Sequence, residues 1–217
     1  MSDELDLTVV IPTLNERENV ELLLPQLRRT LDGMGVRGEI LVLDAGSRDG
    51  TADAAERMGA RAIRLGSGYG EAIRVGLREA RGEYVVTMDA DLSHQPEVVS
   101  RLWSIRHPMT IGIASRYAPG GSARTSATRI ALSRLLNVVF ARGLALPVHD
   151  LSSGFRIYPR RAAQMLEAQA DDFDILPEIL VRAHSSGWRI VEMPFEYAPR
   201  NAGSSKARRI VGTPSPR

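Results

Sequence analysis

Cysteine is absent from this chain of 217 residues, which excludes disulfides, thiolate metal sites and cysteine nucleophiles. Long apolar runs are absent too, because no stretch reaches the roughly 18 apolar residues that a membrane-spanning helix needs. Residues 1–6 carry three acids, the opposite of the basic start of a secretory signal. We therefore expect a cytoplasmic protein whose chemistry depends on carboxylates, histidines and hydroxyls.

Aromatic residues and lysine are scarce. Aromatic residues make up 5% of the chain, which gives little support to nucleic-acid recognition by interleaved basic and aromatic side chains, and we expect no nucleic-acid partner. Lys206 is the only lysine in a chain that otherwise uses arginine. A genome-wide preference for arginine codons explains this bias, and a need for a compact ammonium charge at this position is the functional alternative.

Acidic residues are missing from one long stretch, between Glu97 and Asp150. Residues 199–217 contain no acid either, so the net charge of +2 hides an uneven distribution. A basic region of this kind suits a phosphate-bearing ligand or an anionic membrane. The first acid-free stretch holds seven arginines: Arg101, Arg106, Arg116, Arg124, Arg129, Arg134 and Arg142.

Short apolar runs rich in β-branched residues alternate along the chain with segments of helical periodicity. The alternation predicts an α/β fold with a mostly parallel central sheet and helices on both faces. We expect one domain over residues 1–206, followed by a basic, disordered tail at 207–217. The predicted strands are 7–11, 39–43, 60–65, 84–88 and 109–115 with a strand pair at 188–197, and the predicted helices are 18–31, 51–58, 70–80, 96–105, 160–167 and 176–185.

Residues 123–146 form a long segment whose apolar residues fall on one wide arc if it is helical. Ser133, Arg134 and Asn137 lie opposite that arc. A helix packed against the core explains the pattern, and so does an interfacial helix on a membrane surface, which the adjoining arginines favour. The arc consists of Ala131, Leu132, Leu135, Leu136, Val138, Val139 and Phe140.

Ligands of an open parallel sheet bind beyond the carboxyl ends of its strands, so the residues that follow each strand form the candidate site. These are residues 12–16, 44–50 and 89–91. No G-x-G-x-x-G pattern follows the first strand and no P-loop occurs, which disfavours a Rossmann dehydrogenase and a P-loop NTPase. The glycine cluster at 66–70 makes a tight turn or lets a nucleotide approach, with Gly70 as the candidate contact.

Asp89 and Asp91 end a predicted buried strand two residues apart, so their side chains point the same way in extended backbone. Two carboxylates so close repel each other. A divalent cation, Mg²⁺ or Mn²⁺, relieves this repulsion and shares its coordination with substrate phosphates. The structural alternative is that one aspartate caps the following helix, but the position after a fourth strand favours the metal.

Six motifs occur in the order seen in inverting family 2 glycosyltransferases of the GT-A fold, which the chain resembles over residues 7–206. Within that family it is most similar to polyprenyl-phosphate (dolichyl-phosphate) mannose synthases, because SGFR is combined with R-x-x-G-x-S-K. The motifs are IPTLNE at 11–16, LDAGSRDGT at 43–51, MDADLSHQPE at 88–97, SRY at 115–117, DLSSGFR at 150–156 and PFEYAPRNAGSSK at 194–206.

The resemblance implies a role for each matching residue and a GT-A-type nucleotide-sugar-binding fold. Two departures from the family pattern are Ala45, where a second aspartate is common, and Ser93, where some members have a metal-ligating glutamine; Gln95 lies two residues further on. By resemblance, the nucleotide-sugar donor would contact Pro12, Asn15, Glu16, Asp44 and Asp89, and the metal would be held by Asp89 and Asp91. The acceptor phosphate would contact Arg116, Ser133, Arg134, Arg200 and Lys206. The residues that would act in catalysis are Asp91, Arg116, Arg134 and Arg200.

A phosphate acceptor fits these residues better than a sugar hydroxyl. Its second pKa lies near about 6, so it is ionised at neutral pH and needs cations rather than a carboxylate base. The sequence offers many arginines, no obvious extra base and no Q-x-x-R-W motif of the polysaccharide-polymerising relatives. Single displacement on such an acceptor inverts the anomeric configuration.

We therefore expect an enzyme, attached peripherally to the membrane, that moves a hexose, mannose from GDP-mannose, onto a polyprenyl phosphate at the cytosolic face. The alternatives are a UDP-glucose donor, another acceptor, or a non-catalytic nucleotide-binding subunit. The last of these is suggested by Ala45, which stands where a second aspartate is common. Glu178 either shapes the sugar site or belongs to a solvated face. The remaining candidates are interpreted as structural: His94, His107, His149, His184, Trp103 and Trp188.

Overall fold

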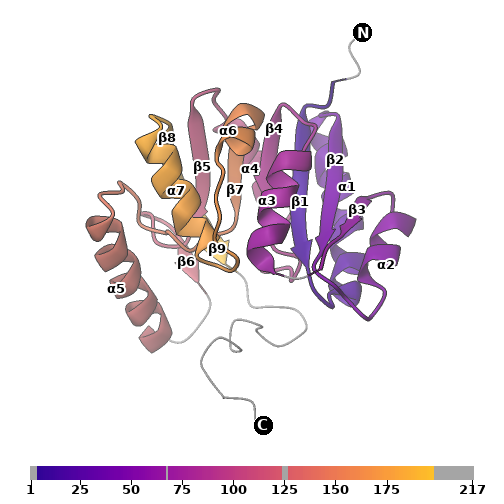
Figure 1. Ribbon diagram of the computed structural model, residues 1–217, viewed down its shortest axis with the longest axis horizontal. Helices are drawn as coiled ribbons and strands as arrows, with labels where there is room; N and C mark the ends of the chain where they lie inside the picture. Colours follow the sequence, from indigo (N-terminus) through magenta and orange to yellow (C-terminus); the bar gives the residue numbers. More distant parts are fainter. Residues whose placement is uncertain (1–3, 67, 124–126, 198–217) are drawn as a thin grey trace.

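A seven-stranded sheet forms the centre of the computed structural model, which describes residues 4–66, 68–123 and 127–197 (Figure 1). The strand order is β3-β2-β1-β4-β7-β5-β8. Its neighbouring strands are parallel except where β7 pairs with β4 and β5, which confirms the mostly parallel sheet expected from the sequence. The strands are β1 (Leu7–Thr13), β2 (Gly38–Asp44), β3 (Arg61–Arg64), β4 (Tyr84–Thr87), β5 (Thr110–Ser115), β7 (Arg156–Pro159) and β8 (Arg189–Pro194), with β6 (Ser122–Ala123) and β9 (Glu196–Tyr197) in a separate two-stranded sheet.

Helices cover both faces of the sheet, as the alternation predicts. Successive side chains of a strand point to opposite faces, so β1 places Val9 and Ile11 in one core and Val10 in the other. The first core is completed by α1, α2 and α4, and the second by α3, α6 and α7. The helices are α1 (Arg17–Met34), α2 (Thr51–Arg57), α3 (Tyr69–Glu79), α4 (Val98–Ser104), α5 (Ala127–Gly143), α6 (Arg160–Met165) and α7 (Ile175–Ser185).

Strand β7 is missing from the sequence prediction. It is only four residues long, begins with Arg156 and ends with Pro159, so its sequence gives no apolar strand signal. All four residues are nevertheless buried, because the strand lies between β4 and β5. Nη1 and Nη2 of Arg156 donate to the carbonyls of Leu176 and Leu151, each at 2.8 Å, which compensates part of the cost of burying the guanidinium.

The prediction of a strand pair at 188–197 is wrong, because the two strands in this segment do not pair with each other. β8 pairs with β5 at the edge of the large sheet, whereas β9 pairs with β6. Between the two strands, Phe195 is buried and its N–H donates to the carbonyl of Ser115 at 3.1 Å. This connection brings residues 194–197 beside residues 115–117, two segments far apart in the sequence.

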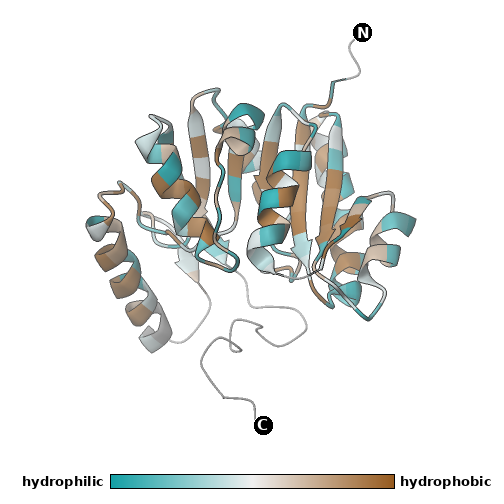
Figure 2. Cartoon of the chain, viewed as in Figure 1, coloured by the Kyte–Doolittle hydropathy of each residue, from teal (hydrophilic) through white to brown (hydrophobic). Residues whose placement is uncertain are grey.

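Helix α5 stands at one side of the molecule and is largely hydrophobic in composition (Figures 1 and 2), and its large apolar side chains between Leu132 and Phe140 are exposed. On its inner side, Ala141 packs into a small apolar cluster with Ile113 and Leu180. Asn137 is buried as well, and its Oδ1 accepts the N–H of Leu151 at 2.7 Å. The hydroxyl of Tyr117 donates to Ser133 Oγ, also at 2.7 Å. The core-packing interpretation of the apolar arc is therefore wrong. Six apolar side chains of the helix are between 37% and 59% exposed: Leu132, Leu135, Leu136, Val138, Val139 and Phe140.

The described part of the chain includes no helix with the length and apolar character needed to cross a membrane. The two tryptophans are packing residues, as expected. Trp188 is buried in the second core, and Trp103 packs against the first, edge-on to Tyr84 with ring centroids 5.6 Å apart.

Candidate functional site

The loops after β1 and β2 meet at the carboxyl edge of the sheet. The two strands end in register, with Thr13 opposite Asp44. The Asn15 N–H donates to Ser47 Oγ at 2.7 Å, and the Arg48 N–H donates to Asn15 Oδ1 at 2.8 Å. These hydrogen bonds hold the two loops together, so the structure brings the first two predicted groups of site residues to one place.

Four residues predicted to bind the nucleotide-sugar lie at this edge: Pro12 and Asp44 at the ends of β1 and β2, and Asn15 and Glu16 in the loop after β1. Asp44 is buried, and its Oδ1 accepts both the N–H and the hydroxyl of Ser47. Asn15 has a φ of +50°, a left-handed conformation that asparagine tolerates better than most residues. The edge therefore has a fixed shape that its own hydrogen bonds maintain, as a preorganised ligand site requires.

The turn after β4 holds the two candidate metal ligands. Asp91 is buried, and the side chain of Asp89 is 31% exposed. The N–H and the hydroxyl of Ser93 both donate to Asp91 Oδ1, while the N–H of Asp89 donates to His94 Nδ1 at 2.9 Å. Ser93, one of the two departures noted in the sequence, thus holds an aspartate in place. Leu92 adopts a φ of +61° at the tip of this turn.

The donor atoms of Asp89 and Asp91 fit Mg²⁺ or Mn²⁺, which prefer carboxylate oxygens. The pair supplies only two side-chain ligands. No group of three or more His, Cys, Asp or Glu side chains placed to bind a metal ion occurs anywhere in the described ranges. A cation between these two carboxylates would take its other ligands from water and substrate phosphates, as Mg²⁺ commonly does. The residues suit a metal shared with a substrate rather than a closed structural site.

Tyr69, at the start of α3, lies beside the candidate metal ligand Asp89 and was not singled out by the sequence analysis. Its ring stacks on Phe173 with centroids 4.4 Å apart. A Cβ added to Gly154 would lie 2.8 Å from the Tyr69 hydroxyl and 3.6 Å from Asp89 Oδ1, so these groups meet at one point. Burial, together with the negative charge of Asp89, raises the pKa of the Tyr69 hydroxyl well above its ordinary value of 10.0. The only sequence signal for this residue is its position just after the third strand.

Gly70 is packed against backbone. Its N–H donates to the carbonyl of Asp171 at 2.9 Å, and a Cβ at this position would overlap the carbonyl of Ala170. The missing side chain thus permits close packing of α3 on the segment before α7. A contact between Gly70 and a nucleotide-sugar stays a prediction.

Glu178 anchors the same segment from the other side. Its carboxylate accepts the N–H groups of Gln169 and Ala170 at 2.8–3.0 Å and the Nε–H of Arg182 at 2.7 Å. Burial acts to raise the pKa of Glu178, but these hydrogen bonds outweigh it and lower the pKa. The contacts give Glu178 a structural role in fixing the loop that carries Phe173, and a role in shaping the sugar site stays a prediction.

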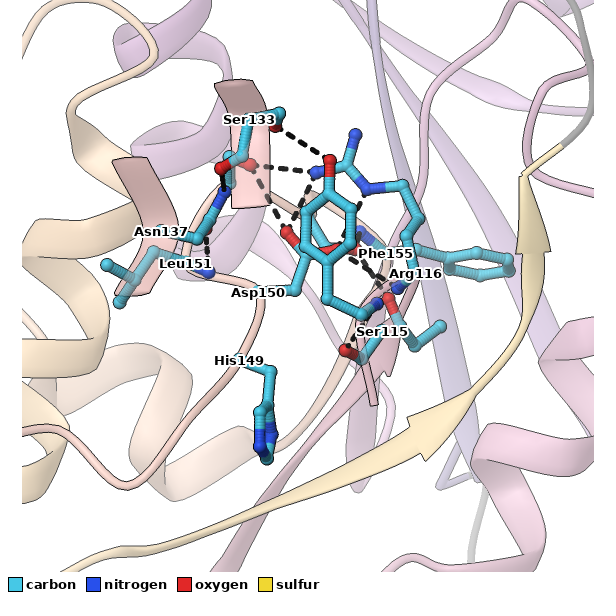
Figure 3. Close-up of polar contacts among 12 residues, drawn as sticks. Ser115, Arg116, Ser133, Asn137, His149, Asp150, Leu151 and Phe155 are labelled. Atoms are coloured by element: carbon cyan, nitrogen blue, oxygen red, sulfur yellow. Dashed lines mark hydrogen bonds and ion pairs between the residues drawn. The ribbon is translucent and has the colours of Figure 1, made fainter. Parts of the chain in front are cut away.

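A second cluster surrounds Arg116, after β5 (Figure 3). The Nε and Nη2 of Arg116 each lie 2.8 Å from a carboxylate oxygen of Asp150, which is completely buried. Nη2 also donates to Ser152 Oγ at 2.7 Å. Burial acts to raise the pKa of Asp150, but the hydrogen bonds and charge of Arg116 outweigh it and hold the pKa below its usual 3.8. Arg116 is therefore a fixed, charged group.

Tyr117 links this arginine to α5. Its ring centroid lies 5.2 Å from the guanidinium carbon of Arg116 and 5.6 Å from that of Arg134, and its hydroxyl donates to Ser133. The structure thus brings together three of the five predicted acceptor-phosphate ligands. Arg200 and Lys206, the other two, lie outside the described residues, as does the predicted tail at 207–217.

Comparison with known proteins identifies relatives of the chain. It is 34% identical over 213 residues to the dolichol-phosphate mannosyltransferase of Pyrococcus furiosus, covering 93% of this chain and 59% of that protein. It is also 34% identical over 218 residues to the polyprenol monophosphomannose synthase of Mycolicibacterium smegmatis, covering 91% of this chain and 79% of that one. The chain thus spans less than two thirds of the length of the Pyrococcus protein.

Solved structures share the fold. Glucosyl-3-phosphoglycerate synthase from Mycobacterium tuberculosis, in complex with Mn²⁺, UDP and glucosyl-3-phosphoglycerate, superposes with a TM-score of 0.71 at 21% identity, covering 95% of this chain and 75% of that one. This likeness confirms the GT-A-type fold. The family model for glycosyl transferase family 2 matches residues 8–166. With the motifs at the carboxyl edge of the sheet and two relatives at 34% identity, this match shows that the chain belongs to glycosyl transferase family 2.

Proposed function

We propose that this protein is a metal-dependent inverting glycosyltransferase that moves mannose from GDP-mannose onto a polyprenyl phosphate at the cytosolic face of a membrane. One observation carries the proposal. Ser133 lies on α5, whose apolar side chains face outward, and bonds through Tyr117 to the surroundings of Arg116. The helix suited to meet a lipid surface therefore also presents the groups suited to bind a phosphate.

The donor would lie at the carboxyl edge of the sheet. Pro12, Asn15, Glu16 and Asp44 would contact the nucleotide, and Asp89 and Asp91 would hold Mg²⁺ or Mn²⁺ against its diphosphate. When bound, the cation stabilises the charge that builds on the departing diphosphate. The solved neighbours support this arrangement, because they contain UDP with Mn²⁺ or Mg²⁺ on the same fold.

The acceptor phosphate would approach Arg116, Ser133 and Arg134, with Arg200 and Lys206 as further ligands. It is already ionised at neutral pH, so these residues need only bind and orient it. Attack of its oxygen on the anomeric carbon breaks the bond to the nucleoside diphosphate and inverts that carbon. The names of the two relatives support a polyprenyl phosphate acceptor.

The membrane part of the proposal rests on the composition of α5. Its exposed apolar face is accompanied by Arg134 and Arg142, and no acid occurs between Glu97 and Asp150. Apolar side chains flanked by arginines suit a helix lying at the surface of an anionic bilayer. Such attachment would bring the phosphate of a membrane lipid toward Arg116.

The decisive experiment is a transfer assay with Mn²⁺ or Mg²⁺ and a short-chain polyprenyl phosphate. We expect a lipid-linked sugar from GDP-mannose, with inverted anomeric configuration. Product from UDP-glucose instead would change the donor and keep the acceptor. If neither donor gives a lipid-linked product, the proposal is contradicted and another acceptor is favoured. If the protein also binds a nucleotide without turning it over, a non-catalytic nucleotide-binding subunit is favoured instead.

A further inference from the structure

His94 lies directly beneath the turn that carries the two candidate metal ligands. Only 2% of its surface is exposed, and its Nδ1 accepts the backbone N–H of Asp89 at 2.9 Å. This bond closes the turn between the two residues. It also uses the Nδ1 lone pair, so the imidazole proton sits on Nε2.

The protonated nitrogen faces a candidate metal ligand. His94 Nε2 lies 3.7 Å from Asp89 Oδ2. This separation is longer than a hydrogen bond, so Nε2 acts on the carboxylate through the polarity of its N–H rather than through a direct bond. One imidazole thus contacts both the backbone and the side chain of Asp89.

Three aromatic rings hold the imidazole in this orientation. His94 stacks on Phe155 with centroids 4.6 Å apart and an interplanar angle of 17°. Phe195 and Tyr197 meet it edge-on, at 5.8 and 6.0 Å. These rings come from two motifs distant in sequence, and their packing leaves the imidazole no room to turn.

We propose that His94 is a positioning residue that aims the carboxylate of Asp89 at the cation shared with the donor diphosphate. The inference rests on the proposed metal-dependent function and adds a role for a histidine that the sequence suggests is structural. Asp91 is held separately by Ser93, so each carboxylate of the pair has its own support. Groups that orient metal ligands in this way typically change metal affinity by about 10- to 100-fold when removed.

Two substitutions separate the two contacts of the ring. In His94→Asn, Oδ1 replaces Nδ1 as acceptor for the Asp89 N–H, but the Nε2–H that lies beside Asp89 Oδ2 in the wild-type protein is lost. In His94→Gln, the longer side chain places an amide N–H near the former Nε2. We expect His94→Asn to weaken metal binding by about tenfold or more, and His94→Gln to stay closer to the wild-type affinity.

Binding is measured without turnover, as the loss of the free Mn²⁺ signal in electron paramagnetic resonance, with GDP or UDP present. His149→Asn, which changes an exposed histidine away from the turn, serves as the matched control and should leave binding unchanged. Thermal unfolding of each variant separates a general loss of fold from a local loss of affinity. In the wild-type protein, long-range ¹H–¹⁵N spectra should show His94 protonated at Nε2 and not at Nδ1, which requires no variant.

The outcomes distinguish this inference from the function on which it rests. Wild-type binding of Mn²⁺ with an unchanged affinity in a folded His94→Asn overturns the role of His94 alone, and so does a proton on Nδ1. Wild-type protein that binds no Mn²⁺ with either nucleotide overturns the metal-dependent function together with this role. Weakened binding in His94→Asn supports the role even if no lipid-linked sugar is formed.

Discussion

Arg116 combines an observed structural role with a predicted role in ligand binding. Its guanidinium is a predicted phosphate ligand and at the same time the partner of buried Asp150. Asp150 is itself fixed, because its N–H donates to Glu192 Oε1 at 2.9 Å. A guanidinium held in this way has already lost its rotational freedom, so binding a phosphate costs less side-chain entropy.

Asp150→Asn tests the ion pair. The substitution keeps the shape of the side chain and removes its charge, leaving Arg116 largely buried without a counter-ion. We expect the free energy of unfolding at pH 7 to fall by about 3 kcal/mol, the usual cost of breaking a buried pair. Urea denaturation measures the loss. Asp171→Asn is the control, because Asp171 pairs with Arg74 while 93% exposed and should change stability little.

The same pair has a defined pH dependence. The pKa of Asp150 is lower in the folded protein than its ordinary 3.8, so its stabilising effect is complete above about that pH. It is lost as the pH falls through the lowered, folded-state pKa. The stability difference between wild type and Asp150→Asn should therefore shrink below about pH 4, and an equal difference at pH 3 and pH 7 would contradict the ion-pair account.

Gly70→Ala tests whether this glycine is required for packing. The added methyl group would overlap the carbonyl of Ala170, and backbone cannot move aside as a flexible side chain does. We expect the free energy of unfolding to fall by about 2 kcal/mol. Gly33→Ala, in α1 with open space around it, should stabilise the protein by about 0.5–1 kcal/mol. Thermal unfolding compares the two, and a neutral Gly70→Ala would argue against the packing role.

At the scale of elements, the sequence predicts those strands whose own residues form an apolar run. Strands β1 and β2 are continuous apolar runs, and the sequence places both within two residues of their observed bounds. Strand β7 was not predictable, because buried Arg156 depends on carbonyls at positions 151 and 176. For α5, the sequence left two orientations open. The observed orientation depends on hydrogen bonds from Leu151 to Asn137 and from Tyr117 to Ser133, and both donors lie on other segments of the chain.

The outward face of α5 leads to a binding prediction. Leu135 and Val139 are 59% and 56% exposed, and each would enter the surface of a bilayer. Replacing both by aspartate puts charge where apolar surface is needed, and burying one such side chain is worth about 1.5–3 kcal/mol. We expect co-sedimentation with vesicles containing anionic lipid to weaken at least about tenfold, with thermal stability retained because neither side chain is buried.

Leu22→Asp is the matched control for this experiment. Leu22 is 48% exposed on α1, so the substitution places the same charge on a different helix. It should leave vesicle binding unchanged. Equal binding by the α5 variant and the control would mean that this helix does not carry the membrane contact.

At the scale of the whole molecule, the predicted nucleotide-sugar ligands and the predicted acceptor ligands lie in different places, the former at the ends of β1, β2 and β4 and the latter after β5 and on α5. Asn15 and Asp89 follow strands β1 and β4, and Asp44 ends β2, whereas Arg116 follows β5, beyond the antiparallel strand β7. The rule for parallel sheets predicted the first group from sequence. Tyr69 and His94 were not predicted as site residues, since their partners Phe173 and Phe155 come from distant segments.

This separation predicts that metal-dependent transfer and membrane binding can be lost independently of each other. Asp91→Asn removes a candidate metal ligand, so transfer should drop by at least about a hundredfold, which corresponds to roughly 2.7 kcal/mol of lost transition-state stabilisation. Because α5 is untouched, this variant should still bind vesicles. The Leu135→Asp, Val139→Asp variant should behave in the opposite way, losing vesicle binding but turning over a detergent-dispersed short-chain acceptor within a few-fold of wild type. Transfer that survives in Asp91→Asn would remove the carboxylate pair from the proposed chemistry, and loss of both properties in either variant would mean that the two properties are not independent.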